Sequence, residues 1–359
     1  MALASLLLAG CAGAPAPSLE TFGVADPPCY DRERQPYTPV VDSHVHFRPF
    51  GGPALPFEEV VGYLERSGVR FANVYGIGQM LPAGSECTYY LDCPGTPVAP
   101  SLRNDFVNAM QAAARGGRGV HLVLSMTFPD LERPEHVLSG MRLLDREFPG
   151  LFRWMGEVNL VKQALFENGH RPVPLATIRD WAPFMAALRE RRMPLAVHAD
   201  LGHDADPTAY LDWIEAVLRT YPDNTVVWMH LGLSRELLTL DAGNHVAILA
   251  SVLERYPKAM LDISWRILED HVFADPANRA VYVDFLNVHS DRILPGTDFV
   301  ASANRGLEDY RSDLRATGRI LRYLDDTAFR NIALGRNYFR LLDLDYEAPP
   351  VCGARDDGG

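Results

Sequence analysis

Five segments of the sequence end in side chains that could together bind a divalent metal ion. In the first segment, 42–46, two histidines stand two residues apart, at His44 and His46. Because side chains alternate along a β-strand, both imidazoles point to one face, where they can bind a single ion. Asp42 lies on the same face, one layer deeper, where its carboxylate could accept the other N–H of a ring. The four other segments end in Glu157, His198, His230 and Asp298.

These segments belong to a regular alternation of short apolar or β-branched runs with amphipathic segments, which is typical of βαβ units and a parallel sheet. The predicted strands are 40–44, 69–75, 120–126, 151–158, 194–198, 225–230, 259–264 and 292–295. The predicted helices are 57–66, 102–115, 134–148, 178–191, 208–221, 245–256 and 279–288. Eight strands with helices between them predict a (β/α)8 TIM barrel, although a doubly wound open sheet shares this alternation. No glycine-rich dinucleotide motif or P-loop opens a predicted helix, which disfavours the open sheet.

In such a barrel the carboxyl ends of the strands meet at one face and build one pocket. Taken singly, a strand-end histidine can simply hydrogen-bond a loop, and Asp298 can cap the helix that follows it. A shared metal site at the C-terminal face explains why such residues end the first, fourth, fifth, sixth and eighth strands together. Two long loops, 76–100 and 159–177, follow the second and fourth strands and are expected to cover this pocket.

Length, composition and charge predict one globular domain that acts on a small molecule. The chain has 359 residues, of which 47% are hydrophobic and 22% charged, and one barrel domain at 39–345 accounts for most of them, with a lead at 12–38 and a tail at 346–359. The formal net charge of −12 repels polyanions, and no run of Lys or Arg offsets it, so no nucleic-acid partner is expected. Beyond the first residues, no apolar stretch approaches the roughly 18 residues that a membrane-spanning helix needs.

The first eleven residues form a short apolar run of the kind found in secretory signal segments. Leu8-Ala9-Gly10-Cys11 resembles a bacterial lipobox, after which Cys11 is acylated and becomes the mature N-terminus. Ala12 is compatible with sorting to the outer membrane, so the resemblance implies an exported, periplasmic, lipid-anchored protein. No Lys or Arg precedes Cys11, although signal segments normally carry one, which leaves an upstream start codon open.

Four further cysteines are present, at Cys29, Cys87, Cys93 and Cys352. In an oxidising compartment an even number favours disulfides, for which three connectivities exist. We favour Cys87 with Cys93, inside one Gly/Pro-rich loop, and Cys29 with Cys352, which would join the lead to the tail. A zinc knuckle is the alternative, but the sequence lacks its CxxC spacing.

The pattern of candidate ligands resembles the amidohydrolase superfamily in both their order and their strand assignment, over nearly the whole chain from residue 40 to about residue 342. The resemblance implies a distorted barrel in which the paired histidines and the strand-eight aspartate bind one ion and the strand-five and strand-six histidines face a second. Carried over to this chain, the ligands of the first ion are His44, His46 and Asp298, and those of the second are His198 and His230. The tail segment 333–342 is similar to the closing helix of the amidohydrolase-related branch and is interpreted as structural.

The fourth strand bears on the number of ions. Many binuclear relatives bridge two ions with a carboxylated lysine there, whereas this chain has Glu157 in a Gly-Glu pair, as the TatD-type deoxyribonucleases do. Lys162 lies too far past the predicted strand to replace it, so Glu157 favours two ions; its alternative role is an ion pair with a loop arginine. By contrast, the branch resembling aminocarboxymuconate-semialdehyde decarboxylase is mononuclear, and there the residue matching His230 is a catalytic acid/base.

The resemblance therefore implies a metal-dependent hydrolase that cleaves a C–O or C–N bond in a lactone, ester or amide. A divalent ion, expected to be Zn²⁺, lowers the pKa of bound water to about 7. Asp298 would take the proton and pass it to the leaving group, and a second ion or His230 would stabilise the oxyanion. Arg266, after the seventh strand, could bind a substrate carboxylate or serve as a structural ion-pair partner.

Three other functions stay open. A mononuclear decarboxylase is favoured if Glu157 does not reach the metal. A TatD-like phosphoesterase is supported by the Gly-Glu pair and opposed by the acidic charge. A non-catalytic, lipid-anchored binding protein is disfavoured because every ligand position holds a competent residue. The sequence predicts neither the substrate nor the oligomeric state.

Overall fold

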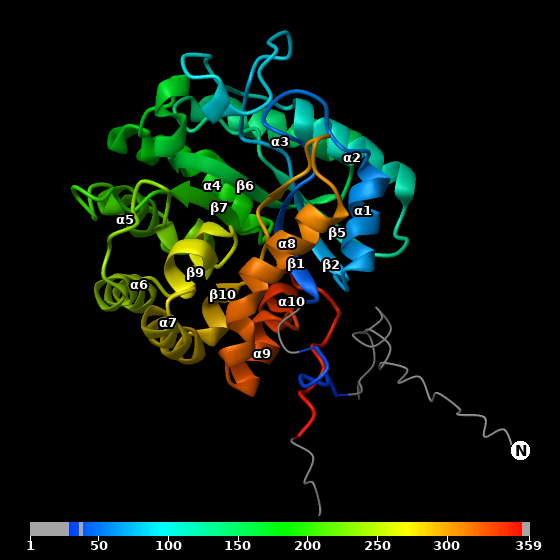
Figure 1. Ribbon diagram of the computed structural model, residues 1–359. Helices are drawn as coiled ribbons and strands as arrows, with labels where there is room; N and C mark the ends of the chain where they lie inside the picture. The colour runs from blue at the N-terminus through cyan, green and yellow to red at the C-terminus, as the bar shows by residue number, and fades with distance from the viewer. Residues whose placement is uncertain (1–28, 36–38, 354–359) are drawn as a thin grey trace, which may run out of the picture.

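The fold is described from a computed structural model, drawn in Figure 1, over residues 29–35 and 39–353. The signal-type segment at 1–11, with the expected lipidation site Cys11, lies outside these residues. Most of the expected lead at 12–38 and the part of the tail beyond residue 353 also lie outside the described residues. Among the residues that the structure describes, no helix combines the length and apolarity needed to cross a membrane.

Parallel strands form a closed barrel, as the alternation predicted. In chain order they are β1 (Val41–His46), β2 (Phe71–Tyr75), β5 (His121–Met126), β6 (Phe152–Val161), β7 (Leu195–Ala199), β8 (Val226–Trp228), β9 (Ala259–Asp262), β10 (Ile293–Leu294) and β11 (Phe299–Val300). The sheet order is β10-β9-β8-β7-β6-β5-β2-β1-β11. A separate antiparallel pair, β3 (Gln79–Met80) with β4 (Ala99–Pro100), lies in the loop after β2.

The barrel closes because β10 and β11 are two halves of the eighth strand. β10 pairs with β9 and β11 pairs with β1, so the short segment between them spans the last gap. That segment is also bonded to β1, since Ser43 N–H donates to the carbonyl of Pro295 (3.0 Å) and Asp298 N–H donates to the carbonyl of His44 (2.8 Å). The interruption makes this a distorted (β/α)8 barrel and sets Asp298 beside the first strand.

Helices surround the barrel (Figure 1). Those that follow successive strands are α1 (Phe57–Arg66), α2 (Arg103–Arg115), α3 (Val137–Glu147), α4 (Ala182–Glu190), α5 (Leu211–Thr220), α6 (Ala242–Arg255), α7 (Pro276–Val288) and α8 (Leu307–Gly318). Two short helices, α9 (Asp326–Ile332) and α10 (Arg336–Leu342), follow them, and α10 corresponds to the predicted closing helix. Four of the five buried residues of α1 show the spacing of an inward-facing stripe: Phe57, Val60, Val61 and Leu64.

Two strand boundaries differ from the prediction in ways that affect the site. β6 continues to Val161, three residues past the predicted end at 158. β8 ends at Trp228 rather than at residue 230, because His230 and Leu231 adopt left-handed backbone angles, with φ of 56° and 55°. A left-handed residue cannot continue a β-ladder, so His230 lies on a sharp turn just beyond its strand.

The two ends of the described chain are joined to each other. Cys29 and Cys352 form a disulfide, the pair favoured from the sequence. Beside it, Tyr30 N–H donates to the carbonyl of Pro350 (2.8 Å), and Cys352 N–H donates to the carbonyl of Tyr30 (3.0 Å). Residues from the expected lead and tail thus pair with each other along the outside of the barrel.

Candidate metal centre

The predicted ligands come together at the carboxyl ends of the strands. His44 and His46 lie on β1 and Glu157 on β6, while the others are His198 on β7, His230 after β8 and Asp298 before β11. They form three overlapping groups, and within each group the candidate ligand atoms lie within 4.8 Å of one another. The groups are His44, His46 and Glu157; His44, His230 and Asp298; and Glu157, His198 and His230.

One half of the cluster is built around the β1 histidines. The Nε2 atoms of His44 and His46 are 3.1 Å apart. Asp298 Oδ1 lies 3.1 Å from His46 Nε2 and 3.5 Å from His44 Nε2, and Glu157 Oε2 lies 3.5 Å from His46 Nε2. Two imidazole nitrogens and two carboxylate oxygens therefore face a single point.

The other half is built around the second oxygen of Glu157. Its Oε1 contacts Nδ1 of His198 and lies 3.5 Å from Nε2 of His230. The two oxygens of one buried carboxylate thus face two different histidine pairs. This carboxylate therefore joins the two halves of the cluster.

The β1 rings have hydrogen-bond acceptors on their far sides. His44 Nδ1 lies 3.2 Å from Asp262 Oδ2, and His46 Nδ1 contacts the carbonyl oxygen of Gly76. When Nδ1 donates to such an acceptor, the lone pair of Nε2 is left facing the centre, as in protein metal sites.

The same holds for the other two rings. His198 Nε2 lies 2.9 Å from Asp200 Oδ1, which leaves Nδ1 facing Glu157. His230 Nδ1 lies 3.3 Å from the carbonyl oxygen of Ser264, which leaves Nε2 facing the centre. All four imidazoles are oriented to present a lone pair inward, so these residues fit one or two divalent cations.

The electrostatics of the cluster also favour a cation. Burial alone would raise the pKa of Asp298, but a hydrogen bond from His46 and the charges of nearby histidines hold that pKa well below its usual range. Burial opposes protonation of His46, yet Asp298 and Glu157 raise its pKa to about 9. A proton on His46 and a divalent cation compete for the same negative potential.

Two expectations from the sequence are wrong in detail. Asp42 does not accept from a histidine ring, because its buried carboxylate accepts instead from Thr297 N–H (3.0 Å) and from the hydroxyls of Thr297 (2.8 Å) and Tyr310 (3.0 Å). Lys162 is not too far from the site, because β6 is longer than predicted. Its Nζ lies 3.5 Å from Oε1 of Glu157.

Sequence reasoning missed the residues that orient the rings, namely Asp200, Asp262 and Ser264. A signal was present, because Asp200 follows His198 by two residues and so lies on the same face of the chain. Asp262 ends the seventh strand, to which no ligand had been assigned.

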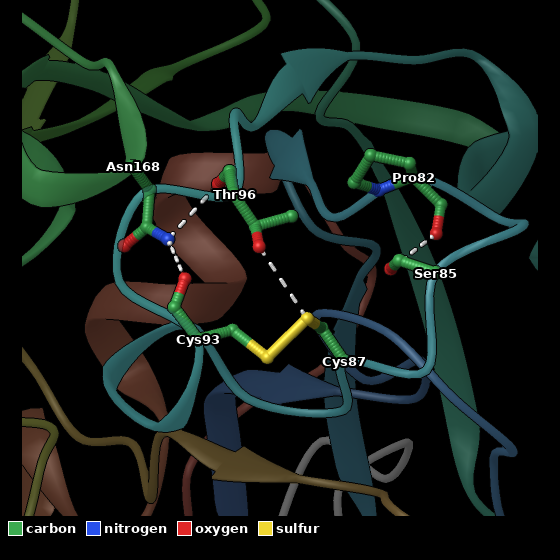
Figure 2. Close-up of a disulfide and its surroundings, with 6 residues drawn as sticks. All are labelled: Pro82, Ser85, Cys87, Cys93, Thr96 and Asn168. Carbon is green, nitrogen blue, oxygen red and sulfur yellow. Dashed lines mark hydrogen bonds between the residues drawn. A yellow bond between two sulfur atoms is a disulfide. The ribbon is translucent and has the colours of Figure 1, made fainter.

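A cavity of about 1070 Å³ opens above the cluster and is lined by His198, His230 and Asp298 among others. Part of its wall comes from the long loop after β2, which a Cys87–Cys93 disulfide closes, again the pair favoured from the sequence (Figure 2). Figure 2 shows Asn168, in the loop after β6, donating to the carbonyls of Cys93 (2.8 Å) and Thr96 (3.0 Å). The two loops expected to cover the pocket are therefore fastened to each other.

Arg266 also lines the cavity, but its guanidinium is already engaged. It lies 2.8 Å from Asp270 Oδ2 and 3.3 Å from Asp313 Oδ1. The structure thus agrees with the ion-pair role that the sequence left open for Arg266.

Comparison with known proteins supports the fold and identifies the family to which the chain belongs. A family model described as amidohydrolase matches residues 103–337. No curated protein sequence matches the chain. Similar solved structures include a zinc-bound amidohydrolase from Burkholderia multivorans (14% identity, 85% of this chain and 99% of that chain, TM-score 0.53). Others are an apo structure from Agrobacterium tumefaciens (16%, 90% and 98%, 0.54) and dihydroorotase from Saccharomyces cerevisiae (10%, 85% and 84%, 0.50). At such identities the structural likeness concerns the fold, but the family model covers more than half of the chain, and the protein belongs to the amidohydrolase family.

Proposed function

We propose that this chain is a metal-dependent hydrolase that cleaves a C–O or C–N bond in a lactone, ester or amide. The observation that carries the proposal is the position of Glu157, whose two oxygens face separate pairs of inward-pointing imidazoles at the base of a cavity. His44, His46 and Asp298 would hold one ion, and His198 and His230 would hold the second. Imidazole and carboxylate ligands suit Zn²⁺ among the common divalent ions.

A bound divalent ion would supply a nucleophile from water at neutral pH and would polarise the scissile carbonyl. Asp298 is the proton acceptor, because its low pKa keeps the carboxylate ionised and its side chain reaches the cavity. The same carboxylate then delivers the proton to the leaving group. The second ion, held by His198 and His230, would stabilise the oxyanion. With a single ion bound, a protonated His230, whose Nδ1 is oriented by the carbonyl of Ser264, would stabilise it instead.

One observation favours a second candidate, a mononuclear decarboxylase. Lys162 Nζ lies 3.5 Å from Oε1 of Glu157, the oxygen that faces His198 and His230. An ammonium group there supplies the positive charge that a second ion would otherwise bring. In that case His230 serves as an acid/base group rather than as a ligand.

The first experiment is the metal content of the purified full-length protein, measured beside Glu157→Gln and a matched Glu190→Gln control on the exposed end of α4. Two equivalents per chain, falling toward one only in Glu157→Gln, support the binuclear hydrolase and direct screening to lactones, esters and amides. One equivalent that Glu157→Gln leaves unchanged supports the decarboxylase. No metal in the wild type after reconstitution with zinc overturns both.

Export to the periplasm and lipid anchoring through Cys11 remain part of the proposal. The two disulfides support it, because such bonds persist in oxidising compartments. Incorporation of labelled palmitate by the wild type and not by Cys11→Ala is the expected result. Equal labelling of the two proteins would contradict the anchor.

A further inference from the structure

Four basic side chains line the cavity above the metal centre: Lys162, Arg235, Arg266 and Arg305. Two share one buried carboxylate, since Arg305 lies 2.7 Å from Asp313 Oδ2 and Arg266 lies 3.3 Å from Asp313 Oδ1. Arg266 also pairs with Asp270, and Lys162 pairs with Glu157. Their charges are therefore largely compensated within the protein.

Arg235 is different. Its side chain is exposed to the cavity, and it forms no ion pair with any carboxylate in the described part of the chain. Its guanidinium carbon lies 5.8 Å from the centre of the Trp265 ring, which is a cation–π contact. Such a contact gives the N–H donors of the guanidinium no hydrogen-bond acceptor, so these donors can bind an anion.

The position of Trp265 relates Arg235 to the metal centre. The Trp265 ring centre lies 5.2 Å from that of His230, so a single indole separates the guanidinium from a candidate metal ligand. A small molecule can therefore reach both groups at once. Tyr90, Arg235 and Asp298 all line this one cavity.

Aromatic rings from the disulfide loop form another part of the cavity wall. Tyr89 and Tyr90 have ring centres 4.5 Å apart, and Phe50 packs edge-on against Tyr90 at 4.7 Å. Tyr90 is held in this position by the small buried cluster that it forms with Phe50, Ile77, Met80 and Leu165. These rings, inclined to one another by 41° and 79°, give the cavity an aromatic, largely apolar wall on which the body of a substrate can pack.

We propose that Arg235 binds a carboxylate on the substrate, while the flat apolar body of that substrate packs on the aromatic wall and its scissile bond lies at the metal centre. The inference rests on the proposed function for the position of the scissile bond. A single negative charge fits best, because Asp92 and Glu236 also line the cavity and would repel a second. The substrate class is therefore an aromatic or similarly planar monocarboxylate that carries a hydrolysable bond.

The test compares two probes that differ only in charge, 2-naphthoate and 2-naphthamide, by calorimetric titration of the full-length protein. It uses wild type, Arg235→Gln, Arg235→Lys and Arg219→Gln, the last an exposed arginine on α5 outside the cavity. Each protein is titrated both zinc-loaded and metal-stripped, so that coordination of naphthoate by zinc is separated from binding by arginine.

We expect wild type and Arg219→Gln to prefer naphthoate by roughly tenfold or more, since charge-assisted hydrogen bonds are worth about that factor. Arg235→Gln should lose the preference in both metal states, and Arg235→Lys should keep part of it. The proposal is overturned if the wild type shows no preference at millimolar probe, or if Arg235→Gln retains it. If the preference for naphthoate depends on Arg235 but the protein hydrolyses no lactone, ester or amide, the carboxylate subsite is supported and the hydrolase is rejected. If the protein hydrolyses such a substrate but shows no preference for naphthoate, the hydrolase is supported and the subsite is rejected.

Discussion

Asp262 is predicted to control metal affinity although it is not a ligand. Its carboxylate is completely buried and accepts from His230 N–H (2.7 Å) and Ser264 Oγ (2.8 Å) through Oδ1, while Oδ2 faces His44 Nδ1 (3.2 Å). Burial alone would raise the pKa of Asp262, but the hydrogen bond and charge of His44 and the charge of His230 lower it, so the group is ionised at neutral pH. The carboxylate of Asp262 thus orients the ring of His44 and stabilises the left-handed turn at His230.

Asp262→Asn keeps the shape of the side chain but replaces one acceptor oxygen by an NH₂ group, which is a hydrogen-bond donor. If the amide oxygen keeps the bonds to His230 and Ser264, the NH₂ group faces His44 Nδ1–H, and two donors oppose each other. Loss of a partner of this kind typically weakens metal binding by about 10- to 100-fold, which corresponds to roughly 1.4–2.8 kcal/mol. An unsatisfied buried donor also costs about 1–3 kcal/mol of folding free energy.

The measurement is zinc affinity, by competition with a chromophoric chelator, for wild type, Asp262→Asn and the exposed control Asp284→Asn on α7. Urea unfolding of the metal-free proteins is measured in parallel, which separates loss of folding from loss of affinity. Wild-type zinc affinity in a folded Asp262→Asn protein would refute the reasoning, because it would mean that the orientation of His44 does not depend on this carboxylate.

Three further predictions concern the scaffold. Replacing Cys29 and Cys352 by serine opens a link across a sequence separation of 323 and should cost about 2–5 kcal/mol; an unchanged urea midpoint would contradict this. Gly296→Ala would set a Cβ 2.7 Å from Cβ of His44. This contact should cost about 1–3 kcal/mol of folding stability and lower the affinity for zinc. Unchanged stability and zinc affinity would show that β1 can shift to make room for the methyl group. Burial raises the pKa of Asp105 to about 7 from a reference of 3.8, so its contribution to stability is full below about pH 4 and declines as the pH rises toward 7. The stability advantage of wild type over Asp105→Asn should therefore narrow across that range in urea titrations, and a widening gap would reverse the assigned sign.

The convergence of the candidate ligands could be predicted because, in a parallel barrel, it depends on local pattern alone. Once a segment is recognised as a strand, alternation decides which side chains face inward, and the carboxyl ends of all strands meet at one face. His44, His46 and His198 needed nothing more. The predicted end of β8 at residue 230 was two residues too late, but this did not affect the prediction for His230. The left-handed turn at His230 takes the residue out of the β-ladder and still places its imidazole in the cluster.

The roles of the long basic side chains could not be predicted in this way, because they depend on pairs rather than on single residues. Arg266 follows a strand end, and from the sequence alone it could either bind a substrate or form a structural ion pair. The structure favours the ion pair, because α8, about forty residues further along the chain, brings Asp313 against Arg266. Within residues 29–35 and 39–353, Arg235 has no carboxylate partner, and its guanidinium lies beside the Trp265 ring. A charged group of a substrate is attracted to the side-chain charge that no ion pair compensates. Which side chain that is depends on the ion pairs formed between distant parts of the chain. The charges that face this cavity therefore depend on its tertiary contacts, whereas the residues of the candidate metal centre are already visible in the order of the strands.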